Sequence, residues 1–248
     1  MKKRIIIFGS TSFLAQNFIN LDNKNKILGI IRNSNNKLIK KENVNYLLTK
    51  SFEVKKLHKI VNKFKPNILI NFISNNNNSK KLEINNQKII HDNVFPFLNI
   101  LESVKELKLK IISFGSIETM KKEQSAYKLA KILQNKINNF YKDKYKLNIT
   151  TIILPTIIGE FEKKQNRFLK LIINKKRIKN KEKVITFSFA RDVITSLNNF
   201  INLNKKISLL IYKKKINYFI NFKKIKKKNT FNEFEKKLSI VFNFYKNN

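Results

Sequence analysis

The sequence predicts an α/β protein with a doubly wound parallel sheet, and two observations carry that prediction. Short apolar runs alternate with longer amphipathic stretches over residues 1–155, a pattern typical of βαβ units. The first of these runs leads directly into a turn of small residues and then into an amphipathic stretch. We therefore expect one α/β domain over residues 1–155 and a small C-terminal lobe over residues 156–248, which partly returns to that domain.

Short apolar runs are the predicted strands of this sheet. They are Ile5–Phe8, Ile27–Ile31, Val44–Leu48, Ile68–Ile73, Leu109–Phe114 and Ile149–Leu154. Helices that cover both faces of a parallel sheet make its strands apolar on both sides. The nearly continuous run Ile68–Ile73 therefore fits a central strand.

The stretches between these runs are predicted helices, because their apolar residues recur at helical spacing. One helix opens at Phe13–Phe18, and the others cover Val54–Phe64, Asn93–Leu107 and Ala126–Phe140. Pro96 would then fall in the first turn of its helix, where the missing N–H removes no hydrogen bond.

Beyond Pro155 the alternation is less regular, and no linker rich in Pro, Gly or Ser separates the two parts. Further elements are expected there, namely helices over Phe168–Ile173, Asp192–Ile201 and Phe231–Phe244, and strands over Ile207–Tyr212 and Tyr218–Phe222. The most basic stretch of the chain, Lys205–Lys228, lies among them.

The net charge of +37, from 53 basic and 16 acidic residues, suits an acidic partner such as nucleic acid or an anionic membrane. However, most of the basic residues are Lys rather than Arg, the better phosphate ligand. Lys, Asn and Ile also share A/T-rich codons, so we favour a compositional bias over a functional basic surface. Tyr218, Phe219 and Phe222 could stack on bases, but we favour core packing for them. We therefore expect neither nucleic acid nor a membrane as a partner.

Several kinds of site are excluded by composition. With no Cys, the chain has no disulfide scaffold, thiolate zinc site or cysteine nucleophile. His58 and His91 have no partner at ligand spacing, so no metal site is expected. The run Ile5–Phe8 is too short for the core of a signal peptide, and no apolar run approaches the length of a membrane span. We therefore expect a cytoplasmic protein.

The turn after the first predicted strand is a candidate binding site. Its small residues Gly9, Ser12 and Ala15 are spaced three apart. In a Rossmann-type dinucleotide site, small residues there allow a tight bend, close approach of the backbone to a pyrophosphate and helix–strand packing. Only one of the three is Gly, but their place in the first βα turn favours such a site.

Tyr127 and Lys131 form a candidate catalytic pair, because a spacing of four places both on one face of a predicted helix. A nearby ammonium lowers the pKa of a phenol, so Tyr127 could act as an acid or base near neutral pH. Ser116, at the end of the preceding strand, could hydrogen-bond the same substrate oxygen. Tyr46 and Lys50 have the same spacing, but a strand would hold them about 13 Å apart.

Six segments, in order along the chain, resemble the motifs of one family. They are the turn Ile5–Ala15, Phe64–Asn71 (F-x-P-D-x-V-I-N), Asn93–Glu102 (N-V-x-G-T-x-N-L-L-E), Ile111–Ser116 with its terminal Ser, Ser125–Lys131 (Y-x-x-x-K) and Ile153–Gly159 (L-R-P-x-x-x-Y-G, one residue short). The chain thereby resembles the extended short-chain dehydrogenase/reductase superfamily over roughly residues 3–200. Within it, the chain is similar to the NAD-dependent epimerase/dehydratase and dTDP-4-dehydrorhamnose-reductase-like group.

The resemblance implies a role for each matching residue. Tyr127 would be the acid/base, Lys131 its pKa-lowering neighbour and a ribose ligand, and Ser116 the group that polarises the substrate oxygen. The implied cofactor contacts lie at the turn, at strand ends and at the catalytic lysine, and they are Gly9, Ser12, Phe13, Leu14, Arg32, Phe72, Lys131 and Pro155.

Arg32 bears on the choice between NAD and NADP. An acidic residue in this region of the family binds the ribose of NAD, and a cation there favours the 2′-phosphate of NADP. Because Arg32 could also be a solvated surface residue, both cofactors stay open, with NADP slightly preferred.

The chain departs from the family pattern in four ways. Ser12 and Ala15 replace two glycines of the turn, and Lys50 stands where an acidic residue lies near the adenine. Ser116 and Tyr127 are only eleven positions apart, and the C-terminal lobe is short. Such changes would narrow the substrate pocket or mark a weakly active relative.

Two hypotheses of function follow from these residues. The first is an NAD(P)-dependent oxidoreductase, epimerase or dehydratase that acts on a nucleotide-linked sugar through Ser116, Tyr127 and Lys131. The alternative is a non-catalytic Rossmann-type protein that binds a nucleotide or a polyanion. The expected partner of the enzyme is its nucleotide-sugar substrate, which the C-terminal lobe over residues 156–248 would bind, and a homodimer is a candidate assembly.

Overall fold

The structure is a computed structural model of the chain, and it describes residues 2–33, 38–75, 86–120, 122, 124–162, 183–216, 218–219 and 232–247. The chain divides into two compact units, Met1–Leu154 and Pro155–Asn248. In the described ranges, no helix is long and apolar enough to cross a membrane. The predicted helix Phe168–Ile173 lies outside them.

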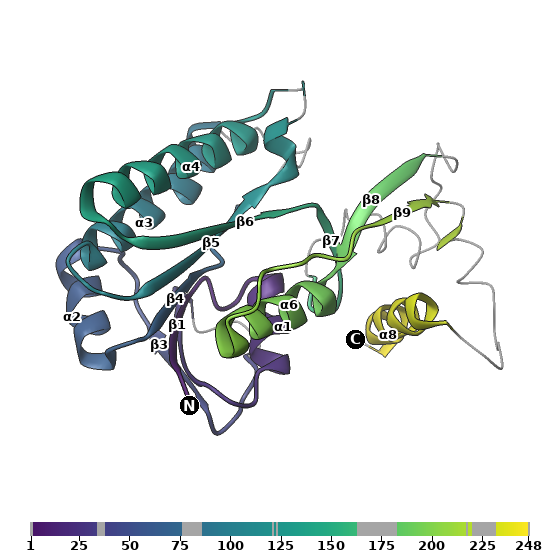
Figure 1. Cartoon of the computed structure of the whole chain (residues 1–248), viewed down its shortest axis with the longest axis horizontal. Coiled ribbons are helices and arrows are strands. Elements are labelled where there is room, and N and C mark those ends of the chain that lie inside the picture. Colours follow the sequence, from purple (N-terminus) through teal and green to yellow (C-terminus); the bar gives the residue numbers. More distant parts are fainter. Residues whose placement is uncertain are drawn as a thin grey trace. The chain divides into compact units, whose positions relative to one another are not determined.

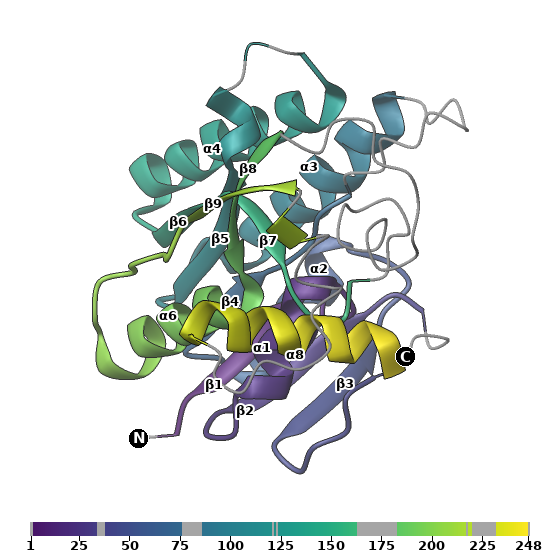
Figure 2. The same cartoon turned by 90° about the vertical axis from the view of Figure 1, so that its right-hand side faces the viewer.

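The first unit is built on a six-stranded parallel sheet with the order β3-β2-β1-β4-β5-β6. Its strands are β1 Arg4–Phe8, β2 Lys26–Ile31, β3 Val44–Leu48, β4 Ile68–Asn71, β5 Lys110–Ser116 and β6 Asn148–Leu154. Figure 2 shows β3 and β6 at the two edges of this sheet. The order reverses direction between β1 and β4, which confirms the doubly wound α/β fold.

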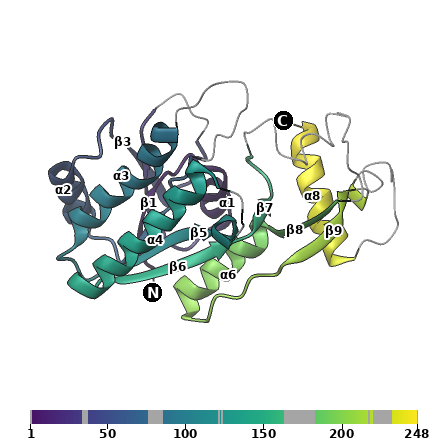
Figure 3. The ribbon, with the colours of Figure 1, turned by 90° about the horizontal axis from the view of Figure 1, so that it is seen from above.

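Helices cover both faces of this sheet (Figure 1). They are α1 Phe13–Leu21 on one face, and α2 Val54–Phe64, α3 Asn86–Val104 and α4 Ala126–Tyr145 on the other. Because β1 to β3 extend in one direction and β4 to β6 in the other, right-handed crossovers put α1 opposite the other three. Figures 1 and 3 show α3 and α4 packed side by side.

The core of the first unit lies between the sheet and helices α2, α3 and α4. Strand residues such as Ile6, Leu69 and Ile111 pack there against Val61 and Phe97 of the helices. Full burial of such a side chain stabilises a fold by about 1.5–3 kcal/mol. This packing holds the strands whose carboxyl ends carry the candidate site.

A polar cluster interrupts this apolar core. Asn138 of α4 donates hydrogen bonds to Ser113 Oγ of β5 and to Thr151 Oγ1 of β6, each 3.0 Å long. The two hydroxyl oxygens lie 3.2 Å apart, and Ser113 and Thr151 are partners in the strand register. The cluster therefore ties one helix to two neighbouring strands.

Pro96 lies inside α3, and the prediction that it falls in the first turn is wrong. The helix begins at Asn86, seven residues before the predicted start at Asn93. Its first residues are mostly polar and exposed, so they carry little apolar spacing from which to read a helix. The Pro96 ring is buried, and this burial offsets the hydrogen bond that its missing N–H removes.

The second unit contains a three-stranded sheet with the order β7-β8-β9. Its described elements are β7 Thr156–Ile158, β8 Val184–Phe189, α6 Ala190–Leu203, β9 Tyr212–Lys215 and α8 Glu233–Asn247. Strand β8 pairs in parallel with β7 and antiparallel with β9. Phe187, Phe189 and Leu238 share one aromatic-rich core, through which α8 packs against β8.

The two strands predicted for the second unit are wrong. The chain has no regular structure over residues 204–211, and β9 begins only at Tyr212. The Tyr212 ring packs against Phe187, whereas Ile211 is exposed and gains nothing from pairing. Tyr218 and Phe219 are helical rather than extended, and Phe222 lies outside the described residues. Phe219 is fully buried, so core packing is confirmed for this residue.

Candidate active site

The turn after β1 requires glycine at Gly9 for two reasons. Its φ is +73°, a conformation that side chains with a Cβ rarely adopt. A Cβ there would also lie 2.8 Å from the Ile73 nitrogen and 2.9 Å from the Phe72 carbonyl carbon. The missing side chain therefore lets the turn pack closely against the loop after β4.

Ser12 begins α1 at the end of this turn. Its Oγ accepts a hydrogen bond of 3.4 Å from the Ala15 N–H, as an N-cap side chain does. The first N–H groups of a helix suit an anion such as phosphate. The start of α1 could therefore hold the pyrophosphate of a dinucleotide.

A cavity of about 270 Å³ lies beside the turn, along the carboxyl ends of β1, β2 and β4. One part of its lining is apolar: Ile30, Ile31, Phe52, Phe72 and Ile73. The remainder is the Gly9 turn with polar side chains: Gly9, Thr11, Ser12, Arg32, Asn33, Ser74, Asn75 and Asp92. Ligands of open parallel sheets bind at this edge, where the strand order reverses.

The cavity brings together four of the predicted cofactor residues, Gly9, Ser12, Arg32 and Phe72. Phe13 and Leu14 form the start of α1 and are not part of this described lining. Pro155 is the first residue of the second unit. The cofactor contacts of all the predicted residues stay predictions.

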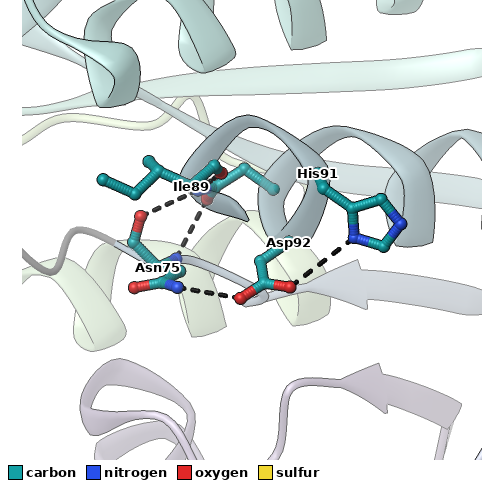
Figure 4. Close-up of polar contacts among 5 residues, drawn as sticks. Asn75, Ile89, His91 and Asp92 are labelled. Atoms are coloured by element: carbon teal, nitrogen blue, oxygen red, sulfur yellow. Dashed lines mark hydrogen bonds and ion pairs between the residues drawn. The ribbon is translucent and has the colours of Figure 1, made fainter. Parts of the chain in front are cut away.

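The loop after β4 is held in the cavity wall by α3. The Asn93 side chain accepts a hydrogen bond from Asn75 N (3.0 Å) and donates to the Asn75 and Ile89 carbonyls (2.7 Å each). The Asn75 side chain donates to Asp92 Oδ2 over 2.9 Å, and His91 Nδ1 lies 3.7 Å from Asp92 Oδ1 (Figure 4). These contacts fix the wall of the cavity nearest to α3.

Tyr127 and Lys131 lie one turn apart on α4, on the predicted helix. The Ser125 Oγ accepts a hydrogen bond from Lys128 N (3.1 Å) and so begins this helix two residues before Tyr127. The Tyr127 hydroxyl oxygen lies 3.4 Å from Ser74 Oγ, and Ser74 lines the cavity. The Lys131 Nζ lies 5.7 Å from the centroid of the Tyr127 ring. The pair therefore reaches the cavity wall through Ser74.

Lys131 is a buried lysine, with 5% of its surface exposed. Its Nζ donates hydrogen bonds to the Phe114 carbonyl (3.0 Å) and to Gln134 Oε1 (2.9 Å). Burial disfavours the charged form and lowers the pKa of Lys131 to about 8. At neutral pH the ammonium is still charged, and a charge in such surroundings acts strongly on its neighbours.

Ser116 is the last residue of β5 and is buried at the carboxyl edge of the sheet. Its Oγ accepts a hydrogen bond of 3.2 Å from the Glu118 N–H. This bond uses a lone pair of the oxygen rather than the hydroxyl proton, which could therefore be donated to a substrate oxygen. Glu118 lies in the short 3-10 helix Ile117–Met120, which follows β5 directly.

Tyr46 lies in β3, as predicted, and its phenol serves the fold. The hydroxyl donates to the Ile39 carbonyl over 2.9 Å, and burial raises the pKa of Tyr46 to about 12. Lys50 is exposed beyond the end of the strand. The second Tyr-x-x-x-Lys match therefore has neither a buried ammonium nor an acidic phenol.

Sequence reasoning missed Ser74, Gln134 and the side chain of Asn93 as parts of the site. Ser74 carried a usable signal, because it follows a predicted central strand at the edge where ligands bind. Gln134 lies three residues after Lys131, a spacing at which helical side chains meet. Asn93 entered the sequence analysis only as the first residue of a family motif, which did not predict its side-chain contacts.

The order of the sheet and the glycine turn after β1 define a Rossmann-type α/β protein. Residues 5–197 match the model of the NAD dependent epimerase/dehydratase family, and the chain belongs to that family. The resemblance inferred from the motifs is thereby confirmed. No curated protein matches the sequence.

Solved structures share the fold over nearly the whole chain. They include dTDP-glucose 4,6-dehydratase from Bacillus anthracis in complex with NAD, which has a TM-score of 0.80 and 13% identity over 99% of this chain and 97% of that one. UDP-glucuronic acid 4-epimerase from Bacillus cereus, in complex with UDP-glucuronic acid and NAD, has a TM-score of 0.80 and 12% identity over 98% and 99%. UDP-glucose 4-epimerase from Thermotoga maritima, with UDP-glucose, has a TM-score of 0.75 and 13% identity over 98% and 99%. At such identities the likeness is one of fold.

Proposed function

We propose that the protein is an NAD(P)-dependent enzyme that acts on a nucleotide-linked sugar through Ser116, Tyr127 and Lys131. The contact between the Tyr127 hydroxyl and Ser74 carries this proposal, because it joins the acid/base candidate to the cavity that Gly9 lines. Family membership supports the reaction class, and similar structures that hold UDP-sugars support the substrate class. In this proposal the second unit, Pro155–Asn248, binds the sugar.

The residues around the cavity fit one end of a dinucleotide. Gly9 brings the backbone close to a ligand, and the N–H groups at the start of α1 suit a pyrophosphate. The apolar wall with Phe52 suits a flat base. The volume of about 270 Å³ is just below the usual range of about 300–1,000 Å³ for ligand pockets, so it suits part of a dinucleotide. When bound, the nicotinamide would supply or accept the hydride.

In this proposal Tyr127, Lys131 and Ser116 together transfer one proton between a sugar hydroxyl and the protein. The Tyr127 phenolate takes a proton from a sugar hydroxyl, or in the reverse direction the Tyr127 phenol returns that proton. The nearby Lys131 ammonium stabilises the phenolate and so lowers its pKa. Ser116 donates a hydrogen bond to the same sugar oxygen and orients it toward Tyr127.

The choice between NAD and NADP depends on Arg32. This residue lies in the cavity wall after β2 and is exposed, so its guanidinium could meet a 2′-phosphate. The dehydratase from Bacillus anthracis and the epimerase from Bacillus cereus hold NAD instead. We keep NADP as the preferred cofactor, and Arg32→Asp should move the preference toward NAD.

Titration of the purified protein with NADH and NADPH tests the proposal first. We expect saturable binding of at least one of them, followed by turnover of one member of a nucleotide-sugar panel. Nicotinamide absorbance and product isomers report that turnover. Failure to bind either cofactor would refute the proposal, and binding without turnover of any sugar would favour the non-catalytic alternative.

A further inference from the structure

Gln134 links the Lys131 ammonium to the main chain of α3. Its Oε1 accepts a hydrogen bond from Lys131 Nζ (2.9 Å), and its Nε2 donates to the Asn93 carbonyl (2.6 Å). The side chain lies one turn beyond Lys131 on α4 and is 6% exposed. An ammonium only donates and a carbonyl only accepts, so the orientation of the amide is determined by its two partners.

We propose that Gln134 is a positioning residue that holds the Lys131 ammonium in place for Tyr127 and for a bound nucleotide. The functional part of this inference rests on the function proposed above. Gln134 connects the two helices at Asn93, whose own side chain holds Asn75 in the cavity wall. Asn93 of α3 is therefore hydrogen-bonded both to Asn75 in the cavity wall and to Gln134, which holds Lys131.

The direction of the Lys131 side chain follows from its hydrogen bonds. An ammonium has three N–H donors. Among the described contacts, the carbonyl of Phe114 on β5 and the amide oxygen of Gln134 on α4 each occupy one. The third donor is left for the Tyr127 phenol or a ligand. Without Gln134 the long side chain would have one fixed contact fewer and several rotamers to choose from.

The Gln134 oxygen also acts on the charge of Lys131. A hydrogen bond accepted from the ammonium favours its charged form, whereas burial lowers the pKa of the lysine. The other described oxygen on Nζ, the Phe114 carbonyl, is neutral. The titratable group beside the ammonium is the phenol of Tyr127 on the same helix. Removal of Gln134 should therefore lower the pKa of Lys131 further.

The ammonium of Lys131 can be followed directly by ¹⁵N NMR, because a buried and hydrogen-bonded ammonium exchanges its protons slowly. The Lys131→Met variant assigns the signal by its loss. Gln134→Met removes both hydrogen bonds at similar volume. Gln134→Glu keeps the acceptor for Lys131 and loses the donor for Asn93. Asn138→Leu is the matched control, because Asn138 is also a buried amide on α4 but bonds to Ser113 and Thr151.

In Gln134→Met we expect the pKa of Lys131 to fall by about one unit, the scale of a lost hydrogen bond to a charged group, and cofactor binding to weaken because less of the lysine is charged. In Gln134→Glu the added negative charge should raise that pKa and keep the slow-exchanging signal. Asn138→Leu should lower the melting temperature and leave the signal and pKa of Lys131 unchanged.

A Lys131 signal and pKa in Gln134→Met that match those of Asn138→Leu would overturn the inference. If Gln134→Met does not fold, Gln134→Glu decides, and an unshifted Lys131 pKa in that variant overturns the inference equally. The NMR measurement needs no substrate. A responsive Lys131 in a protein that binds no nicotinamide nucleotide would refute the proposed function alone, and an unresponsive Lys131 in a protein that binds one would refute the positioning role alone.

Discussion

The two Tyr-x-x-x-Lys matches of this chain share their spacing and differ in secondary structure, in the partner of the phenol and in the burial of the lysine. Tyr46 lies in β3, its hydroxyl is bonded to the Ile39 carbonyl, and burial raises its pKa to about 12. Tyr127 lies in the first turn of α4, with its hydroxyl beside Ser74 of the cavity wall. The lysines differ as well, because Lys50 is exposed and Lys131 is buried.

The difference shows that secondary structure decides what a sequence spacing means. Four residues along a strand separate two side chains by about 13 Å, whereas four residues along a helix place them one turn apart. Burial then changes the acidity of the lysine, since it lowers the pKa of Lys131 to about 8. The same substitution at two matched residues, one in the candidate site and one outside it, therefore tests the assignment of the site.

The largest effect is expected from Gly9→Ala, with Gly29→Ala as its counterpart. A Cβ at Gly9 would meet the backbone of Ile73, so the cavity wall must shift, and its positive φ adds about 1–2 kcal/mol of strain. Nicotinamide-cofactor binding should be abolished in a protein that still folds. A Cβ at Gly29 would lie 2.8 Å from the Tyr46 ring and 3.1 Å from the Ser10 Cβ, both side chains rather than backbone, so it should weaken that binding far less. Calorimetric titration and thermal melting of both variants check this contrast.

Lys131→Met should damage two steps at once, because Lys131 is proposed to contact the ribose and to stabilise the phenolate. We expect weaker cofactor binding together with a loss of turnover that exceeds the range of about 10²–10⁴-fold for one acid/base group. Lys50→Met should change neither quantity. Equal losses in the two variants would contradict the assignment of the site.

Tyr127→Phe keeps the aromatic ring and removes only the hydroxyl, so the fold and cofactor binding should survive. Turnover of an accepted sugar nucleotide should fall by about 10²–10⁴-fold. Tyr46→Phe, measured in the same steady-state assay, should leave turnover nearly unchanged. If Tyr46→Phe is the variant that loses activity, the acid/base lies in the other pair.

The smallest effect is a pair of opposite pH dependences of stability. Between about pH 8 and 10.5 the unfolded chain holds the Lys131 proton and the folded chain does not, so this residue makes the free energy of unfolding rise with pH. Between pH 10 and about 12 the folded chain holds the Tyr46 proton and the unfolded chain does not. Tyr46 therefore makes the free energy of unfolding fall with pH in this range. Across pH 8–12 the melting temperature should rise less steeply in Lys131→Met and fall less steeply in Tyr46→Phe, because other lysines and tyrosines with shifted pKa values keep part of each slope. Curves that stay parallel to those of the unmodified protein would disprove both pKa shifts.

The first sheet was predictable because its strands are almost wholly apolar. Runs such as Ile5–Phe8 and Ile68–Ile73 can be read without knowledge of their partners. The strand β8, Val184–Phe189, was not predicted, although its β-branched and aromatic residues suit a strand. The position of β9 depends on the packing of Tyr212 against Phe187 and Phe189, which lie more than 20 positions away.

The candidate site was predictable only where its parts are local in sequence. The turn at Gly9 and the helical pair Tyr127 and Lys131 each follow from neighbouring residues. The contact of Tyr127 with Ser74 spans 53 positions, and that of Gln134 with Asn93 spans 41. Such contacts form only once α3, α4 and the sheet have packed, so no local sequence pattern predicts them.

The polar cluster of Asn138, Ser113 and Thr151 has a consequence for how this chain avoids misfolding. Neighbouring strands of the first sheet have very similar sequences, such as Ile5–Ile7 in β1 and Ile68–Ile70 in β4. If one such strand shifts along its neighbour, isoleucine still packs beside isoleucine. Apolar burial alone therefore discriminates weakly between alternative registers of the strands. A slip of β6 against β5 would part the Thr151 hydroxyl from Ser113 and Asn138 and leave buried polar groups unpaired, at about 1–3 kcal/mol each. The polar cluster therefore specifies the alignment of β5 with β6, which apolar burial alone specifies weakly.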